Sequence, residues 1–311
     1  MKSKTIGKAL RSDFRLNKYK YLIVLPVIVY FAIFAYKPMY GLIIAFKDYR
    51  PALGLMDSPW ANPWYKQFLN WFTDPFFYRV MRNTFSISLL SIIFGFPAPI
   101  LLALLINEIR NAAFKRTVQT ITYMPYFISL VVVCSLIRTY VGHRGIFSEI
   151  SMALGGEAKN FLMYKEYFYT IFISSDIWQF IGWNSIIYLA AITGIDQEQY
   201  EAARVDGANR LQHIFLITLP NLMPIITILF ILRIGSILNV SFEKVLLLYN
   251  SSTYEVSDII STYVYRRGLG IGSSPNYSFG AAVGLFNSAV NLFFLLTANF
   301  ISRRFSGNSL F

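Results

Sequence analysis

The stretch EAARVDGANRLQHIFLITLP, residues 201–220, is polar and tightly patterned, yet it lies between two long apolar segments. Ala203 and Gly207 are four residues apart and therefore share one face of a helix. Gly207 also permits a turn that other residues resist, and Asn209 with Gln212 three residues later is typical of the cap of a second helix. The stretch therefore predicts two short helices joined by a turn at Gly207.

The second of these helices has one mostly apolar face. Its residues at positions i, i+3, i+4 and i+7 are Leu211, Ile214, Phe215 and Thr218. We expect Pro220 to end this helix, because the residue before a proline is disfavoured in helical conformation. Glu201 and Ala202 flank the small-residue face of the first helix. The two helices and the turn between them form a rigid elbow, residues 197–220. Its small-residue tip suits insertion into a cleft on another protein.

The composition indicates a membrane protein. Of the 311 residues, 55% are hydrophobic and only 14% are charged, whereas a soluble domain has about 25% charged residues. The net charge of +12 could suggest a nucleic-acid partner. The basic residues instead cluster in short segments beside apolar runs, which is the positive-inside pattern of integral membrane proteins. We therefore expect a lipid environment and no nucleic-acid partner.

The residues that commonly bind metals are few and scattered. Cys134 is the single cysteine and lies in an apolar run, so the chain cannot form an intrachain disulfide. His143 and His213 lie in different polar segments. A structural zinc site needs a cluster of Cys and His, so we expect no metal site.

Six segments are apolar and long enough to cross about 30 Å of hydrocarbon, which takes about 20 residues in a helix. They lie near residues 20–45, 83–107, 118–139, 168–192, 222–243 and 277–301. The predicted fold class is therefore an all-α integral membrane protein with six transmembrane helices.

The charge distribution predicts the orientation of these spans. Segment 1–20 has seven basic residues against one acid, Asp13, and this places it in the cytoplasm. Alternation then places the elbow in the cytoplasm too, between the fourth and fifth spans. The domain organisation is a basic segment 1–20, a transmembrane domain 21–302 and a cytoplasmic tail 303–311. In the first outside loop, residues 64–72 predict a short amphipathic helix at the membrane surface.

The elbow has the pattern Glu201-Ala202-Ala203, three residues, Gly207, nine residues, Ile217-x-Leu219-Pro220. This pattern resembles the EAA loop of permease subunits in binding-protein-dependent ABC importers. Other stretches are similar to the maltose-permease-like branch that transports oligosaccharides: YKPMYGLIIAFKDY (36–49), NTFSISLLSIIFGFPAPILLALLINEIRN (83–111), TITYMPYFIS (120–129) and IWQFIGWNSIIYLAAITGID (177–196).

The resemblance implies a type I ABC importer permease fold in the bacterial cytoplasmic membrane. The implied partners are a second, related permease, two ATPase subunits and an extracytoplasmic solute-binding protein. The elbow would sit in a groove on an ATPase and transmit its motion to the spans. The implied coupling residues are Glu201, Ala202, Ala203, Asp206, Gly207, Ile217, Leu219 and Pro220.

The chain itself lacks the G-x-x-x-x-G-K-[ST] loop of an ATPase. The glycine-rich run GLGIGSSP, residues 268–275, has no following lysine and is interpreted as a flexible turn in an outside loop. We therefore expect no enzymatic activity and no cofactor in this chain, with ATP and Mg²⁺ bound by the partner ATPase.

Polar residues within predicted spans are costly and usually face a cavity or a partner. The candidates for a substrate pathway are Asp176, Trp178, Gln179, Trp183, Asn184, Arg233, Asn239, Glu243, Asn287 and Asn291. Tryptophan faces and amide side chains are suited to binding sugars. Asp176 and Arg233 could contact substrate or pair with one another. Arg233 would favour a carboxylated sugar, so we predict import of an oligosaccharide that contains uronic acid.

Other classes of function are less consistent with the sequence. A permease for a different solute, such as an amino acid or phosphate, is excluded by no single residue. A stand-alone secondary transporter usually has an internal repeat, and none is clear here. A membrane enzyme would need a catalytic cluster at one membrane face, and none is visible.

Overall fold

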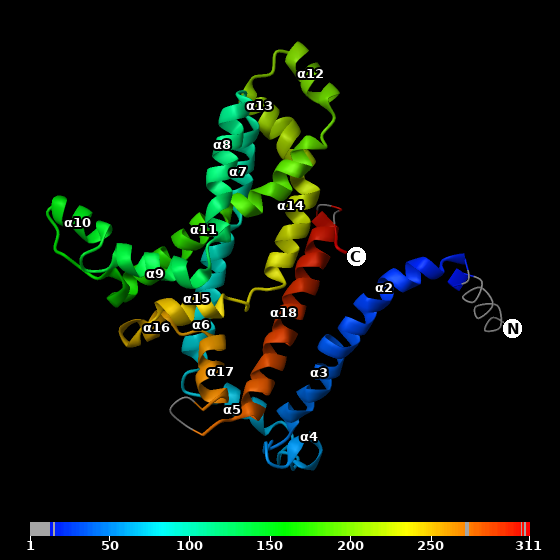
Figure 1. The fold of residues 1–311 in the computed structure, drawn as a ribbon, viewed down its shortest axis with the longest axis vertical. Helices are drawn as coiled ribbons and strands as arrows, with labels where there is room; N and C mark the ends of the chain where they lie inside the picture. Colours follow the sequence, from blue (N-terminus) through cyan, green and yellow to red (C-terminus); the bar gives the residue numbers. More distant parts are fainter. Residues whose placement is uncertain (1–12, 15, 271–273, 306, 308) are drawn as a thin grey trace.

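Helices form the framework of this protein, as Figure 1 shows. The structure, a computed structural model, describes residues 13–14, 16–270, 274–305, 307 and 309–311. Over these residues it has no β-strand beyond one isolated bridge between Lys47 and Trp60, which confirms the all-α prediction. Most of the basic segment 1–20, part of the run 268–275 and two residues of the tail 303–311 lie outside the described residues.

In the described part of the chain, five helical segments are long and apolar enough to cross a membrane. They are Lys18–Phe46, Phe77–Asn107, Leu130–Ala153, Arg210–Ile234 and Tyr277–Arg304. The first of them begins with α2 (Lys18–Phe31) and continues through α3 (Lys37–Met39). In Figure 1, α2 stands apart from the other helices, and none of its side chains is buried.

Three π-helical turns in the described residues each end two residues before a proline. Ala32–Tyr36 precedes Pro38, Ser91–Gly95 precedes Pro97, and Ile214–Thr218 precedes Pro220. A proline lacks an N–H donor, and its ring clashes with the carbonyl group four residues earlier. A wider turn relieves this clash, so each helix continues past its proline.

The prediction that Pro220 ends a helix is therefore wrong. The helix continues from the π-helical turn Ile214–Thr218 into α14 (Leu219–Ile234), where Pro220 occupies the first turn. In the same way, α6 (Phe77–Leu90) continues through Ser91–Gly95 into α7 (Pro97–Asn107) and covers the predicted second span.

The predicted span 118–139 is not one helix. Helix α8 (Ala112–Tyr123) ends in a 3-10 turn at Met124–Phe127. Ile128 and Ser129 are extended, and the Ser129 hydroxyl caps a new helix, α9 (Leu130–Val141), by accepting the Val132 N–H. Figure 1 shows α9 and α10 (Ile146–Ala153) leading away from α8 to one side.

Helix α11 (Lys165–Thr193) covers the predicted span 168–192. Its 29 residues make it about 43 Å long, at 1.5 Å per residue. It is absent from the five apolar segments because Asp176, Gln179 and Asn184 lower its hydropathy. Helix α11 packs against α7 and α8. At Gly182, a Cβ atom would overlap the carbonyl oxygen of Thr122, so glycine permits this close approach to α8.

The predicted fifth span, 222–243, is too long. Helix α14 ends at Ile234, and a Cβ atom at Gly235 would lie only 2.5 Å from the Leu295 side chain of α18 (Tyr277–Phe305). The chain then turns and begins α15 (Phe242–Leu248). The short helices α4 (Gly54–Asp57), α16 (Tyr254–Ser257) and α17 (Ile260–Gly268) complete the end of the molecule away from the elbow.

The predicted amphipathic helix at residues 64–72 corresponds to α5 (Lys66–Phe72). The Trp71 side chain is fully buried and contacts the rings of Tyr263 and Phe279 at centroid distances of 6.2 and 6.0 Å. These aromatic contacts pack α5 against α17 and α18, so the loop helices form part of the core.

Candidate functional site

The elbow consists of α12 (Gln197–Val205), a turn at Gly207 and α13 (Arg210–His213), and α12 protrudes beyond the other helices in Figure 1. Gly207 has φ +80°, a conformation that glycine adopts at little cost. The Asn209 side chain accepts the Gln212 N–H at 3.0 Å, and the Gln212 side chain accepts the Asn209 N–H at 2.7 Å. The predicted helix, turn and capped second helix are confirmed.

Two side-chain contacts fix the base of the elbow to the start of α14. The Tyr200 hydroxyl and the Thr218 hydroxyl are 2.9 Å apart, and the Asn221 amide donates to Gln199 Oε1 at 3.0 Å. Thr218 is buried. The sequence analysis placed Thr218 on an apolar face and did not single out Tyr200 or Asn221. The available signal was that Thr218 is the one polar residue among the four on that face, which indicates that its hydroxyl needs a hydrogen-bond partner.

The surface of the elbow is largely open. Among the predicted coupling residues, Glu201, Ala202, Asp206, Gly207 and Pro220 are exposed. Ala203, Ile217 and Leu219 are half-buried. Uncovered apolar side chains lie on the same element: Val205, Leu211, Phe215 and Leu216. Leu211, Phe215 and Leu216 belong to Arg210–Ile234, a segment apolar enough to cross a membrane, so lipid and a partner protein are both possible covers for these side chains.

A cavity of about 650 Å³ lies between α7, α11 and α14. We call it the polar cavity, because charged and polar side chains lie among the apolar residues of its wall. Four of the predicted pathway residues line it: Asp176, Trp183, Asn184 and Arg233. Ser91 and Ser236 add hydroxyl groups to its wall. One face of the Trp183 indole is covered by Tyr126, which stacks on it at a centroid distance of 4.2 Å and an interplanar angle of 2°. The sequence analysis did not single out Tyr126.

Asp176 and Arg233 do not form the ion pair that was one of the two alternatives. Asp176 instead pairs with Lys244 Nζ at 3.2 Å. Arg233 lines the cavity and, among the described residues, has no carboxylate within ion-pair distance. Lys244 was not singled out, because the predicted fifth span ended at residue 243 and Lys244 fell just beyond it.

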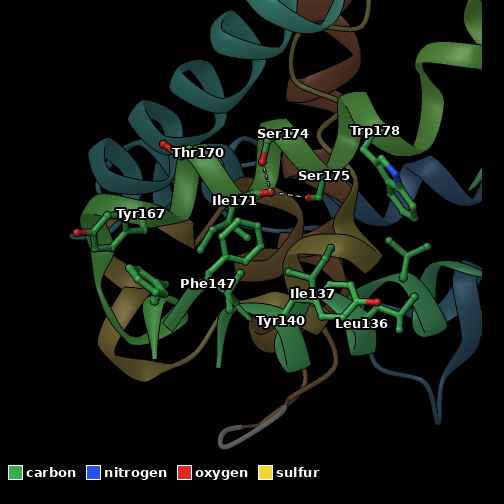
Figure 2. A pocket seen from close by; sticks show the side chains of 13 residues that line it. Leu136, Ile137, Tyr140, Phe147, Tyr167, Thr170, Ile171, Ser174, Ser175 and Trp178 are labelled. Atoms are coloured by element: carbon green, nitrogen blue, oxygen red, sulfur yellow. Dashed lines mark hydrogen bonds between the residues drawn. The ribbon is translucent and has the colours of Figure 1, made fainter. Parts of the chain in front are cut away.

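Trp178 and Gln179 do not line this polar cavity. Trp178 lines a separate apolar cavity of about 620 Å³, formed by α9, α10 and α11 and shown in Figure 2. Gln179 is buried, and its amide donates to the Ile128 carbonyl at 3.3 Å, where the chain between α8 and α9 is extended. Gln179 therefore stabilises the break in the predicted third span.

Four further predicted residues lie away from the polar cavity. Asn239 and Glu243 are outside the fifth helix, because α14 ends earlier than predicted. Asn291 of α18 accepts the Leu238 N–H at 3.0 Å and donates to Asn239 Oδ1 at 3.1 Å. These bonds stabilise the turn after α14. Asn287 lines a third cavity, of about 320 Å³.

The described residues contain no group of three or more His, Cys, Asp or Glu side chains that could hold a metal ion. The cavity thus offers binding chemistry through hydrogen bonds, one free guanidinium group and apolar walls.

The comparisons with known proteins agree with this architecture. Residues 95–307 match the family described as "Binding-protein-dependent transport system inner membrane component". The chain is 44% identical over 298 residues to the polygalacturonan/rhamnogalacturonan transport system permease protein YteP of Bacillus subtilis, covering 95% of this chain and 91% of that protein.

Two solved structures are similar over almost their whole length. One is a bacterial ABC transporter involved in the import of the acidic polysaccharide alginate, with 43% identity and a TM-score of 0.86. The other is a bacterial alginate ABC transporter in complex with a periplasmic protein that holds an alginate pentasaccharide, with 42% identity and a TM-score of 0.86. Each similarity covers 96% of this chain and 99% of the other. This chain therefore belongs to the family of binding-protein-dependent transport system inner membrane components and has the type I ABC importer permease fold.

Proposed function

We propose that this chain forms, together with a second permease, the pathway by which an ATP-driven importer carries an acidic oligosaccharide across the bacterial cytoplasmic membrane. The observation that carries the proposal is Arg233, a cation without a carboxylate partner among the described residues, in the wall of a large polar cavity. The similar proteins named above include transporters of polygalacturonan and of alginate, and both polymers consist largely of sugar carboxylates.

The cavity has the groups that an acidic sugar requires. A guanidinium group can bind a carboxylate with two parallel hydrogen bonds, and Arg233 provides one. The Asn184 amide and the Ser91 and Ser236 hydroxyls can bond to sugar hydroxyls. The Trp183 ring is 41% exposed and offers an apolar face to the sugar ring.

The elbow is proposed to join the chain to one of two ATPase subunits, which bind ATP and Mg²⁺. Its fixed base lets it move as a unit with the start of α14, and α14 lines the cavity. Motion of an ATPase would thus reach the substrate pathway directly. In this arrangement the elbow and both chain ends lie in the cytoplasm, and an extracytoplasmic binding protein delivers the sugar.

The proposed substrate can be tested with a pair of arginine variants. Arg233→Gln removes the cavity charge, whereas Arg138→Gln removes an exposed charge that lies outside the cavity. We expect Arg233→Gln to lower uptake of trigalacturonate about tenfold, or about 1.4 kcal/mol, and Arg138→Gln to leave it unchanged. Equal uptake of acidic and neutral trisaccharides by both variants and by the wild type would contradict an acidic substrate.

Family membership argues against the stand-alone secondary transporter. The alternative is a permease of the same family that transports a chemically different solute. The same uptake assay distinguishes this alternative from an oligosaccharide permease. Such a permease would transport neither the acidic nor the neutral trisaccharide.

A further inference from the structure

Lys244 is a fully buried lysine directly behind the polar cavity. Its Nζ donates to the Phe172 carbonyl at 3.1 Å and to Asp176 Oδ1 at 3.2 Å. The same ammonium group lies 4.8 Å from the centre of the Phe172 ring. The side chain is 0% exposed, whereas Asp176 is 33% exposed and lines the cavity. Asp176 therefore bonds to a buried cation while its carboxylate also faces the cavity.

The net charge at the cavity depends on Lys244. Among the described residues, the charged side chains that line the cavity are Asp176 and Arg233. Taken alone, these two would cancel, and the cavity would attract an anionic sugar only weakly. Lys244 adds a third charge, which compensates Asp176 and leaves Arg233 in excess. Burial strengthens these interactions, because the effective dielectric constant is lower away from water.

We infer that Lys244 is a specificity-determining residue: by neutralising Asp176 from behind, it gives the cavity a net positive charge that selects carboxylated sugars. Lys244 is not expected to touch the substrate, because it is fully buried. This inference rests on the proposed function, since it concerns the charge of the same cavity.

A purely structural role is the alternative. The pair connects α15 to α11, and Val245 and Leu248 of α15 pack in the same core as Phe172. Buried ion pairs, however, often add no stability over apolar side chains of similar volume. The two roles differ in one respect: a structural role affects acidic and neutral sugars equally, whereas a charge role changes their ratio.

The test measures direct binding to the purified complex of permeases and ATPases, in the absence of the solute-binding protein. Only the membrane cavity then determines the preference. The two ligands are trigalacturonate and its fully methyl-esterified form, which has the same backbone without charge. The variants are Lys244→Met, Asp176→Asn and the double variant that combines them.

We expect Lys244→Met to lower the acidic-to-neutral affinity ratio about tenfold, because it leaves the Asp176 carboxylate uncompensated. The double variant should restore the ratio, since it removes one positive and one negative charge. Asp176→Asn alone keeps a hydrogen-bond acceptor for Lys244 and should raise the ratio above that of the wild type. If the ratio does not rise in Asp176→Asn, the charge of this pair does not reach the ligand and the inference fails, even where Lys244→Met does not assemble.

Two results would overturn the inference. One is a ratio that stays the same in Lys244→Met and in Asp176→Asn. The other is a double variant that remains as unselective as Lys244→Met. A wild type that binds both ligands equally is distinguishable from these results, because it contradicts the proposed acidic substrate itself.

Discussion

The hydroxyl groups of Tyr200 and Thr218 lie 2.9 Å apart and join the first helix of the elbow to the turn that leads into α14. The Tyr200 ring also lies 5.9 Å from the His213 ring on the second helix. Both arms of the elbow are thereby fixed to one helix of the cavity wall. This contact provides a direct mechanical connection between the elbow and the wall of the polar cavity.

Tyr200→Phe should weaken this connection without removing the ring contact. Loss of one partly buried hydrogen bond costs about 1 kcal/mol, so we expect a modest loss of stability. The larger effect should be on coupling, with several-fold fewer sugars transported per ATP hydrolysed. The measurement is the ratio of uptake to ATPase activity in proteoliposomes. Tyr78→Phe, at a residue that is 75% exposed, is the matched control and should keep the wild-type ratio.

At Gly207, a substitution should be tolerated if the new residue can adopt a positive φ, whatever the size of its side chain. The φ of +80° at Gly207 is unfavourable for alanine by about 1–2 kcal/mol, whereas asparagine adopts this region more readily. Apart from its two chain neighbours, no atom of the described residues lies within 4 Å of a Cβ built at this position. We therefore expect Gly207→Asn to retain more of the co-purifying ATPase than Gly207→Ala. If the smaller alanine retains more, size at the tip is decisive and the conformational explanation is wrong.

Gly182→Ala should destabilise the protein through the contact between α11 and α8. A Cβ atom at Gly182 would overlap the Thr122 carbonyl oxygen, and overpacking of this kind costs about 1–3 kcal/mol. Gly284→Ala in α18 is the control, since no atom of the described residues, other than its chain neighbours and the backbone of α18 itself, lies within 4 Å of a Cβ there. Thermal unfolding of the purified variants should show a lower midpoint for Gly182→Ala alone. Equal midpoints would mean that the two helices are not closely packed.

Leu211 offers a test of the uncovered elbow surface. This side chain is 64% exposed on α13, so a charge there should be tolerated by the isolated fold but not by an apolar interface. We expect Leu211→Glu to lower co-purification of the ATPase at least tenfold. Leu154→Glu, at a residue that is 82% exposed after α10, should leave it unchanged. An ATPase that remains bound to Leu211→Glu would place the interface elsewhere.

The elbow was predictable because its structure depends on local rules. A cap between residues three apart and a glycine with positive φ are both visible in a short stretch of sequence. The end of its second helix was not predicted correctly. A proline was expected to stop that helix, but a π-helical turn before Pro220 accommodates the ring and lets the helix continue.

The cavity was predictable only in part, because long-range contacts decide which polar groups face it. Asp176 finds its partner 68 residues away, in Lys244, and no local pattern indicates this pairing. Asn291 similarly bonds to Asn239, 52 residues away, so both amides stabilise a turn instead of lining the polar cavity. The break after α8 was signalled by Pro125 and Ser129, but the apolar residues on both sides favoured one continuous span.

ATP-dependent uptake by the purified assembly is the most direct test of the proposed transport function. The chain would be isolated from its own membrane with every co-purifying subunit, reconstituted into proteoliposomes with the solute-binding protein, and supplied with trigalacturonate. We expect a second permease and an ATPase to co-purify, and uptake to require ATP hydrolysis. If the chain purifies alone and transports the sugar without ATP, it is not a subunit of an ATP-driven importer.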